Sequence, residues 1–179
     1  MLERTAVTLR EIGDFRGAGV YAIYYSGAFP PYRRIAERNR DGAFEAPIYV
    51  GKAVSQGARK GVLNIDAPPG KVLAKRLREH RESIEQATNL DVKDFHCRYL
   101  VVEDIWVPLG ESLLIQRTSP LWNLVVDGFG NHDPGKGRHA GQQPLWDVVH
   151  PGRPWASRLA RNTKSERDIL TEIETFLRA

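Results

Sequence analysis

Two apolar runs, thirty residues apart, decide the fold: GVYAIYY at Gly19–Tyr25 and PIYVGK at Pro47–Lys52. Both runs are rich in β-branched and aromatic residues and are bounded by Gly or Pro, which is the pattern of β-strands. Side chains alternate in direction along a strand, so two such strands, once paired, can bring Tyr21 and Tyr49 to one face of a sheet. The triplets GVY and YVG therefore predict paired strands that carry neighbouring phenols.

The composition is that of a soluble globular protein with a basic surface. The chain has 179 residues, enough for one domain with a hydrophobic core, and 41% of them are hydrophobic and 27% charged. The formal net charge is +4 and the isoelectric point is about 9.3. This balance points weakly to a polyanionic partner such as nucleic acid.

The cysteine count and the hydropathy of the chain limit the cellular compartments in which the protein is expected. Cys97 is the single cysteine, so neither an intrachain disulfide nor a cysteine-based zinc site can form. The first residues lack the apolar core of a signal peptide, and no apolar stretch reaches the roughly 20 residues that span a bilayer. We expect a cytoplasmic protein with no membrane partner.

Helical and extended patterns alternate along the rest of the chain. Leu73, Leu77 and Ile84 share one stripe at helical spacing, which predicts a helix from Lys71 to about Thr88 with these side chains inward. Thr163 and Glu166 fit a capping box before a last helix. The other expected elements are strands at 19–26, 47–51 and 95–103 and helices at 8–12, 32–40, 109–118 and 165–178.

The order strand, strand, helix, strand, helix indicates an α/β (α+β) sandwich with a small, mixed or antiparallel, three-stranded sheet. Pro108 opens the 109–118 helix and Pro120 closes it, so Glu111 is expected in the first helical turn. Arg76 and His80, four residues apart, point the same way from their helix.

The order of polar residues resembles one family. The GIY-YIG nuclease superfamily is named for two such triplets, and places an Arg and a His on the next helix, a metal-binding Glu on a later helix and an Asn beyond it. The corresponding positions in this chain are Tyr21, Tyr49, Arg76, His80, Glu111 and Asn123.

The resemblance extends to one subgroup. A long insert between the triplets, a Gly-rich insert before the Arg helix and a C-terminal tract, GFGNHDPG followed by WD and HPGR, are similar to small type II restriction endonucleases that cut CCGCGG. The likeness covers about Gly17 to Ala156. It implies a single endonuclease domain over 1–179, with the core at about 17–126 and a loop-rich extension at 127–179. It also implies double-stranded DNA as substrate and a homodimer on a palindromic, G/C-rich site.

The chemistry of phosphodiester hydrolysis assigns a task to each of these residues. Glu111 would hold Mg²⁺, one ion per site, with Mn²⁺ as a substitute. Arg76 would grip a phosphate oxygen. Tyr21 is expected to orient and deprotonate the attacking water, helped by His80 or Lys52, because a phenol with a pKa of about 10 is a poor base. Tyr49 would hydrogen-bond the phosphate or the water, and Asn123 would support the site. The sequence leaves open which tyrosine is the base.

Reading of G·C pairs in the major groove favours Arg, Lys, Gln and Asn donors, and glycines beside basic residues suit approach to a phosphate backbone. The DNA-binding candidates are Arg33, Arg34, Arg38, Arg59, Lys60, Arg138, Gln142, Gln143 and Arg153.

Other interpretations remain beside this one. A structure-specific or homing-type nuclease, or a DNA-binding relative without catalysis, would share the same core. Gly130 to Lys136 imitates a nucleotide-binding P-loop, but Gly137 stands where Ser or Thr should bind Mg²⁺, so no nucleotide cofactor is expected. His132, Asp133 and His139 are read as loop residues and not as a second metal site.

Overall fold

The centre of the molecule is an antiparallel four-stranded sheet in the order β1-β4-β2-β3. The computed structural model describes residues 1–55, 70–135 and 140–178. The strands are β1 (Val7–Thr8), β2 (Gly19–Tyr25), β3 (Pro47–Ala53) and β4 (Phe95–Val101). The α+β class is confirmed, but the sheet has one strand more than expected. The expected helix at 8–12 is wrong in part, because Val7 and Thr8 pair with β4 and only Leu9–Glu11 (η1) is helical.

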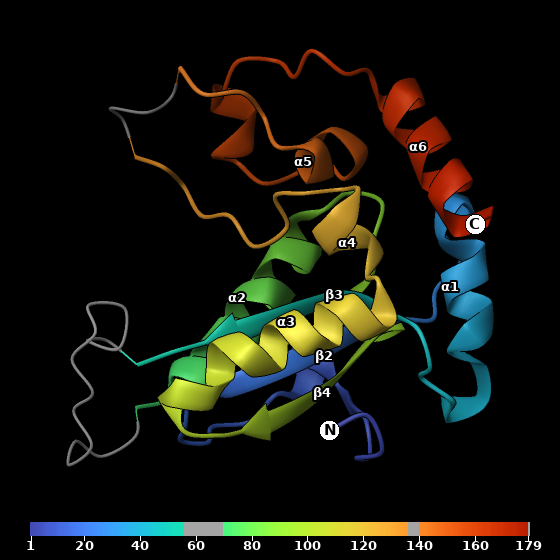
Figure 1. The fold of residues 1–179 in the computed structure, drawn as a ribbon. Coiled ribbons are helices and arrows are strands. Elements are labelled where there is room, and N and C mark those ends of the chain that lie inside the picture. Colours follow the sequence, from blue (N-terminus) through green and yellow to red (C-terminus); the bar gives the residue numbers. More distant parts are fainter. Residues whose placement is uncertain (56–69, 136–139, 179) are drawn as a thin grey trace.

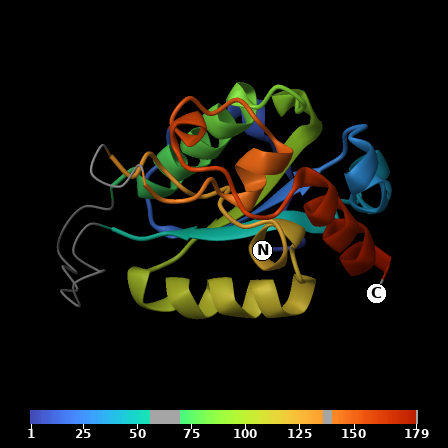
Figure 2. The same ribbon diagram turned by 90° about the horizontal axis from the view of Figure 1, so that it is seen from above.

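Strand β2 lies between β3 and β4 and is buried on both sides. Tyr21, Ile23 and Tyr25 belong to the main core, whereas Val20 belongs to a cluster with Val107 on the other face. Helix α2 (Val72–Gln86) covers the first face and helix α3 (Val107–Thr118) the second, so the core has three layers (Figures 1 and 2). Two buried faces explain why β2 is a continuous apolar run without polar alternation.

Helix α2 matches its prediction closely. Leu73, Leu77 and Ile84 are all fully buried against the sheet. The two ends differ by only a residue or two from the expected 71–88, which is the usual uncertainty of helix termini.

Helix α3 begins two residues earlier than predicted. The short 3₁₀ segment Asp104–Trp106 (η6) runs directly into it, and Pro108 sits in its first turn. Glu111 therefore lies beyond the first turn, and its expected place there was wrong. The helix ends at Ser119, which adopts a left-handed conformation with φ of 44°, before Pro120. Helix α4 (Leu121–Leu124) follows.

The insert between β2 and β3 forms a compact excursion: η2 (Pro30–Tyr32), α1 (Arg33–Arg38) and η3 (Arg40–Gly42). Buried Asn39 fastens it to the strands. Its amide nitrogen donates to the carbonyls of Tyr25 and Ala46, and its amide oxygen accepts from the Ala46 N–H, each at 2.9 Å. A 3₁₀ helix, η5 (Val92–Asp94), precedes β4.

The C-terminal extension contains α5 (Leu145–Val149), η8 (Ala156–Arg158) and α6 (Glu166–Arg178). Trp146 is fully buried and packs edge-on to Trp122, so the extension shares the main core. The C-terminal end of α6 meets the beginning of α1 (Figure 1), where the guanidinium of Arg34 donates to the Leu177 carbonyl.

The expected Thr163–Glu166 capping box is wrong. Ser165 and Asp168 form the reciprocal pair instead, since the Asp168 N–H donates to Ser165 Oγ and the Ser165 N–H to the Asp168 carboxylate. No helix in the described ranges is long and apolar enough to cross a membrane.

Buried His150 makes the stability of this core depend on pH. Its Nε2 is bonded to the Tyr32 hydroxyl at 2.6 Å and its Nδ1 to the Asn89 side chain at 2.9 Å. Burial first, and the positive charge of Arg153 second, lower the pKa of His150 to about 3. Between that value and the ordinary 6.5, the unfolded chain binds a proton that the folded chain excludes. The free energy of unfolding therefore falls as pH is lowered through this window.

We predict that urea unfolding followed at pH 7.0, 6.0 and 5.0 gives a falling free energy of unfolding, with His150 contributing up to about 1.4 kcal/mol per pH unit. His150→Gln should lower stability at pH 7 but flatten this slope. The matched control is Gln142→Ala, because this exposed side chain has no ionisable group and its loss should keep the slope. An unchanged slope in His150→Gln contradicts the assignment.

Candidate active site

Two phenols lie together on the α2 side of the sheet, as predicted. Tyr21 faces Gly51 in the β2–β3 register, and Tyr49 faces Ile23 two residues along. The ring centroids of Tyr21 and Tyr49 are 6.2 Å apart. Tyr21 is fully buried, whereas Tyr49, on the edge strand, is half-buried.

The glycine of the second triplet makes room for the tyrosine of the first. A Cβ atom placed on Gly51 would lie 2.6 Å from Cζ of Tyr21. It would also overlap the hydroxyl oxygen of Tyr21. Real Cβ atoms do not approach that closely, so only glycine at this position lets the Tyr21 ring lie across β3. The glycine of the YVG triplet is thus required for the tyrosine of the GVY triplet to pack in this position.

His80 completes the buried end of the site. Its Nε2 is 2.5 Å from the Tyr21 hydroxyl oxygen, and its ring stacks on Phe129 at 4.5 Å and 16°. Burial, followed by the charge of Arg76, lowers the pKa of His80 well below 6.5, so the imidazole is neutral at pH 7. Burial likewise raises the pKa of Tyr21 well above 10. A neutral imidazole therefore shares a short hydrogen bond with a protonated phenol.

Arg76 brings a positive charge to the same two phenols. This charge opposes the effect of burial on the pKa of both Tyr21 and Tyr49. Its guanidinium is held from several sides: Nη2 donates to the Gly130 carbonyl at 2.7 Å, and Nη1 donates to Glu79 at 3.1 Å. Nη1 also bonds to Nε2 of His132. These contacts fix the direction of the Arg76 guanidinium, and its side chain is 21% exposed.

Glu111 reaches the site from the opposite helix. It lies on α3 and is paired with Lys52 of β3, with Nζ and Oε2 2.7 Å apart. Strand β3 is an edge strand, so groups from both faces can meet around it. Burial has the largest effect on the pKa of Tyr21 and of Tyr49, and it raises both. The negative charge of Glu111 raises both pKa values further, by a smaller amount. Glu111 thus acts electrostatically on both phenols.

The donor set near Glu111 fits one hard cation. No group of three or more His, Cys, Asp or Glu side chains that could hold a metal occurs within the described ranges. A single carboxylate suits Mg²⁺, which keeps several waters and takes further oxygens from substrate phosphate. The described residues therefore offer one carboxylate, that of Glu111, as a protein ligand for such an ion.

Asn123, the last of the six predicted residues, supports the edge strand. Its amide nitrogen donates to the Val50 carbonyl and its amide oxygen accepts from the Val50 N–H, both at 2.8 Å. The side chain thus pairs with β3 as a neighbouring strand would, and it fixes α4 beside Tyr49. All six residues, together with Lys52, border the same stretch of β3.

The predicted DNA-binding residues are scattered. Arg33 is exposed and lies 3.8 Å from Glu37, and Arg34 is tied to the end of α6. Gln142 is exposed beside Ala160, while the Gln143 side chain donates to the Asp147 carbonyl. Arg59, Lys60 and Arg138 lie outside the described residues.

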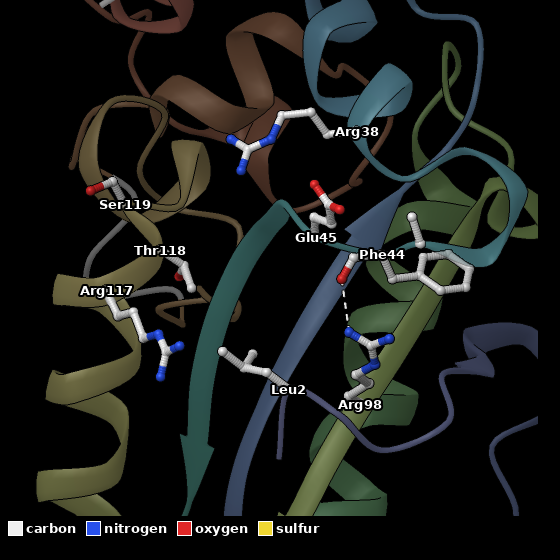
Figure 3. A pocket seen from close by; sticks show the side chains of 9 residues that line it. Leu2, Arg38, Phe44, Glu45, Arg98, Arg117, Thr118 and Ser119 are labelled. Carbon is white, nitrogen blue, oxygen red and sulfur yellow. Dashed lines mark hydrogen bonds between the residues drawn. The ribbon is translucent and has the colours of Figure 1, made fainter.

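Arg38 borders a surface hollow of about 410 Å³ near the start of β3. Arg98 and Arg117 also line it (Figure 3), with Glu45 as the acidic residue of its wall. Arg98 is braced by donating to the Phe44 carbonyl at 2.8 Å. Three arginines from separate elements thus gather away from the two tyrosines.

Arg153 is placed differently from the expectation. It is 2% exposed, and its Nε donates to Asp147 at 2.6 Å. The rest of the guanidinium donates to Asp147 and to the carbonyls of Gly128, Phe129 and Asn131, between the rings of Trp146 and Trp155. Its donors are used inside the protein. Arg153 is therefore removed from the residues that could read bases.

Sequence reasoning did not assign Phe129, Gly130 and His132 to the site. Phe129 stacks on His80, and the other two hold Arg76. The available signal was the GFGNH run itself, whose glycines permit close approach: a Cβ on Gly130 would be 2.9 Å from the Tyr49 hydroxyl and 3.0 Å from the Arg76 guanidinium.

The fold and the site together define a GIY-YIG nuclease: a small antiparallel sheet with two tyrosines, next to an Arg, a His, a Glu and an Asn. A family model described as the Eco29kI GIY-YIG domain matches residues 13–177. The chain therefore belongs to the Eco29kI GIY-YIG family, a family of restriction endonucleases. No individual curated protein matches it.

We predict that Gly51→Ala displaces the Tyr21 ring from His80 and lowers the free energy of unfolding by about 1–3 kcal/mol, the usual cost of overpacking a core. The matched control is Gly13→Ala, because a Cβ there would meet nothing within 4 Å. Urea unfolding of the two variants checks this. Equal stabilities would show that the Tyr21 ring does not need the space above Gly51.

Proposed function

We propose that the protein is a Mg²⁺-dependent type II restriction endonuclease that hydrolyses double-stranded DNA at a short palindromic, G/C-rich site, with CCGCGG as the candidate. The observation that carries this proposal is the meeting of opposite charges at one pair of phenols. The charges of Arg76 from α2 and Glu111 from α3 both shift the pKa of Tyr21 and of Tyr49. His80, which shares a hydrogen bond with Tyr21, is neutral. A family of restriction endonucleases implies DNA as the partner.

Water activation is assigned to Tyr21 with His80. A phenol of raised pKa is a weak acid but, once deprotonated, a strong base, so it needs a partner that takes its proton. We assign Nε2 of neutral His80, 2.5 Å from the Tyr21 hydroxyl, to accept that proton while Tyr21 takes one from water, so that the water loses a proton and His80 gains one. Tyr49, half-buried on the edge strand, hydrogen-bonds the scissile phosphate or the water.

Arg76 is assigned to a non-bridging phosphate oxygen. The planar guanidinium favours this task over an ammonium group. Its contacts with Gly130, Glu79 and His132 fix its direction before substrate arrives, which lowers the entropy lost on binding. Asn123 keeps β3, and with it Tyr49, in register.

Glu111 is assigned to the metal. When bound, Mg²⁺, or Mn²⁺ in its place, would supply Lewis acidity at the phosphate and stabilise the leaving 3′ oxygen. Lys52 neutralises the Glu111 carboxylate in the free protein, at 2.7 Å. With metal and DNA present its ammonium is free to turn toward phosphate.

DNA binding is assigned to the basic surface. The net charge of +4 favours a polyanion, and Arg33, Arg38 and Gln142 present polar groups at the surface. The hollow around Arg38 can receive a backbone phosphate from the same duplex. A palindromic site requires two copies of the protein related by a two-fold axis.

Digestion of a mapped plasmid, with Mg²⁺ or with EDTA, tests the function directly. We predict a fixed set of fragments with Mg²⁺, the same fragments with Mn²⁺, and intact plasmid with EDTA. Fragments that map to one palindrome support a type II enzyme. Cleavage at branched or irregular sites only would select a structure-specific nuclease, and binding without cleavage would select an inactive relative.

We predict that Glu111→Gln binds the cognate duplex with affinity close to wild type but cuts it at least about 100-fold more slowly, because the amide replaces a charged metal ligand. A gel-shift titration in Ca²⁺ and single-turnover cleavage in Mg²⁺ measure the two properties. Glu82→Gln, an exposed carboxylate on the outer side of α2, is the control and should cut normally. Cleavage by Glu111→Gln near the wild-type rate removes Glu111 from the metal role.

A further inference from the structure

The outward face of α3 is apolar, which is unusual for a helix at a protein surface. Ile105, Trp106, Leu109 and Leu113 are 54–58% exposed and fall on one side of the helix at spacings of three and four. Ser112 and Gln116 complete this side. We call these six residues the α3 face.

None of the six residues of the α3 face is charged, whereas the outer sides of α2 and α6 carry charged residues. Exposed positions of α2 include Lys75 and Glu82, and those of α6 include Arg167 and Glu174. A helix that is apolar on both sides is expected to be covered on both sides. Its inner side already lies on the sheet through Val107 and Leu114.

We infer that the α3 face is a homodimer interface, in which α3 packs antiparallel against α3 of a second copy across a two-fold axis. The inference rests on the proposed function, because a palindromic site requires such an axis. In a two-fold contact the same patch faces itself, so it must be complementary to itself. An uncharged apolar helix face meets this condition.

The charges at the two ends of the α3 face support the antiparallel arrangement. Exposed Glu103 lies just before the helical run 104–118, and exposed Arg117 lies at its other end. Antiparallel packing centred near Gly110 places Glu103 of one copy beside Arg117 of the other, twice. Parallel packing would instead bring like charges together.

The size of the face fits a dimer better than a chance exposure. Four large side chains, each more than half exposed, present on the order of 400 Å² of apolar surface, which is the size of the largest apolar patch on many monomers, and such patches are often functional. That is about half of the roughly 800 Å² per partner in a standard interface, and the polar rim can supply the rest.

DNA is a poor occupant of this face, since a polyanion binds basic and polar groups. Glu111 projects from the opposite side of the same helix, toward Lys52. One helix would therefore carry both the dimer contact and the metal ligand, so that the two-fold axis fixes the positions of the two active sites relative to each other.

Sedimentation equilibrium at micromolar concentrations, without DNA and without metal, tests the interface independently of cleavage. The wild type is expected at the mass of two chains, and Leu109→Glu at one, with the dimer dissociation constant raised at least about 100-fold. Leu124→Glu is the matched control, because Leu124 is equally exposed (53%) but lies on α4. It should remain dimeric. Circular dichroism and cooperative thermal unfolding establish that each variant is folded.

A charge-reversal set tests the orientation. Glu103→Arg and Arg117→Glu should each weaken the dimer, and the double variant should restore it, since the pair is remade with its signs exchanged. A wild-type monomer, or a Leu109→Glu variant that stays dimeric, overturns the interface; a double variant no tighter than the single variants overturns the antiparallel register. Fragments from the plasmid digestion would still establish the nuclease in each of these cases.

Discussion

The hydrogen bond between Tyr21 and His80 is the interaction on which the rest of the site depends. It joins the central strand to α2 across the core, at 2.5 Å and out of contact with solvent. It can form only because β3 passes Tyr21 with a glycine, so the antiparallel register of β2 and β3 is itself part of the chemistry. A shift of that register by one residue would turn Tyr49 to the other face of the sheet. The fold thus tolerates little change at the triplets, for steric reasons that precede any contact with DNA.

The C-terminal extension holds the loop that packs on His80 and Arg76. Buried Arg153 and Asp147 would be costly as isolated charges, but every face of the guanidinium is satisfied by a carboxylate, three carbonyls and two indole rings. These bonds hold the loop that carries Phe129 and Gly130. That loop in turn places an aromatic ring on His80 and a carbonyl on Arg76. Arg153, far along the chain, therefore helps to orient Arg76.

The position of β3 at the edge of the sheet explains how side chains from both layers lie near one another. Tyr49 and Gly51 face α2, while Lys52 faces α3 and Glu111. Because no further strand among the described residues covers β3, Asn123 satisfies the free backbone of Val50, and both sets of side chains reach the same border. An inner strand would separate them by the thickness of the sheet.

The sequence by itself determined strands β2, β3 and β4, the α2 stripe and the order of the six polar residues, because periodicity and triplet spacing are local properties. It also indicated the nuclease family. It missed β1, whose two residues become a strand only through pairing with β4, and it misplaced the cap of α6, where Ser165 and Asp168 competed with Thr163 and Glu166. Only the tertiary structure decided that Arg153 is buried, that Gly130 and His132 hold Arg76, and that one face of α3 is left uncovered. These outcomes depend on contacts between distant segments, and a residue type alone does not reveal which charge is satisfied inside the protein.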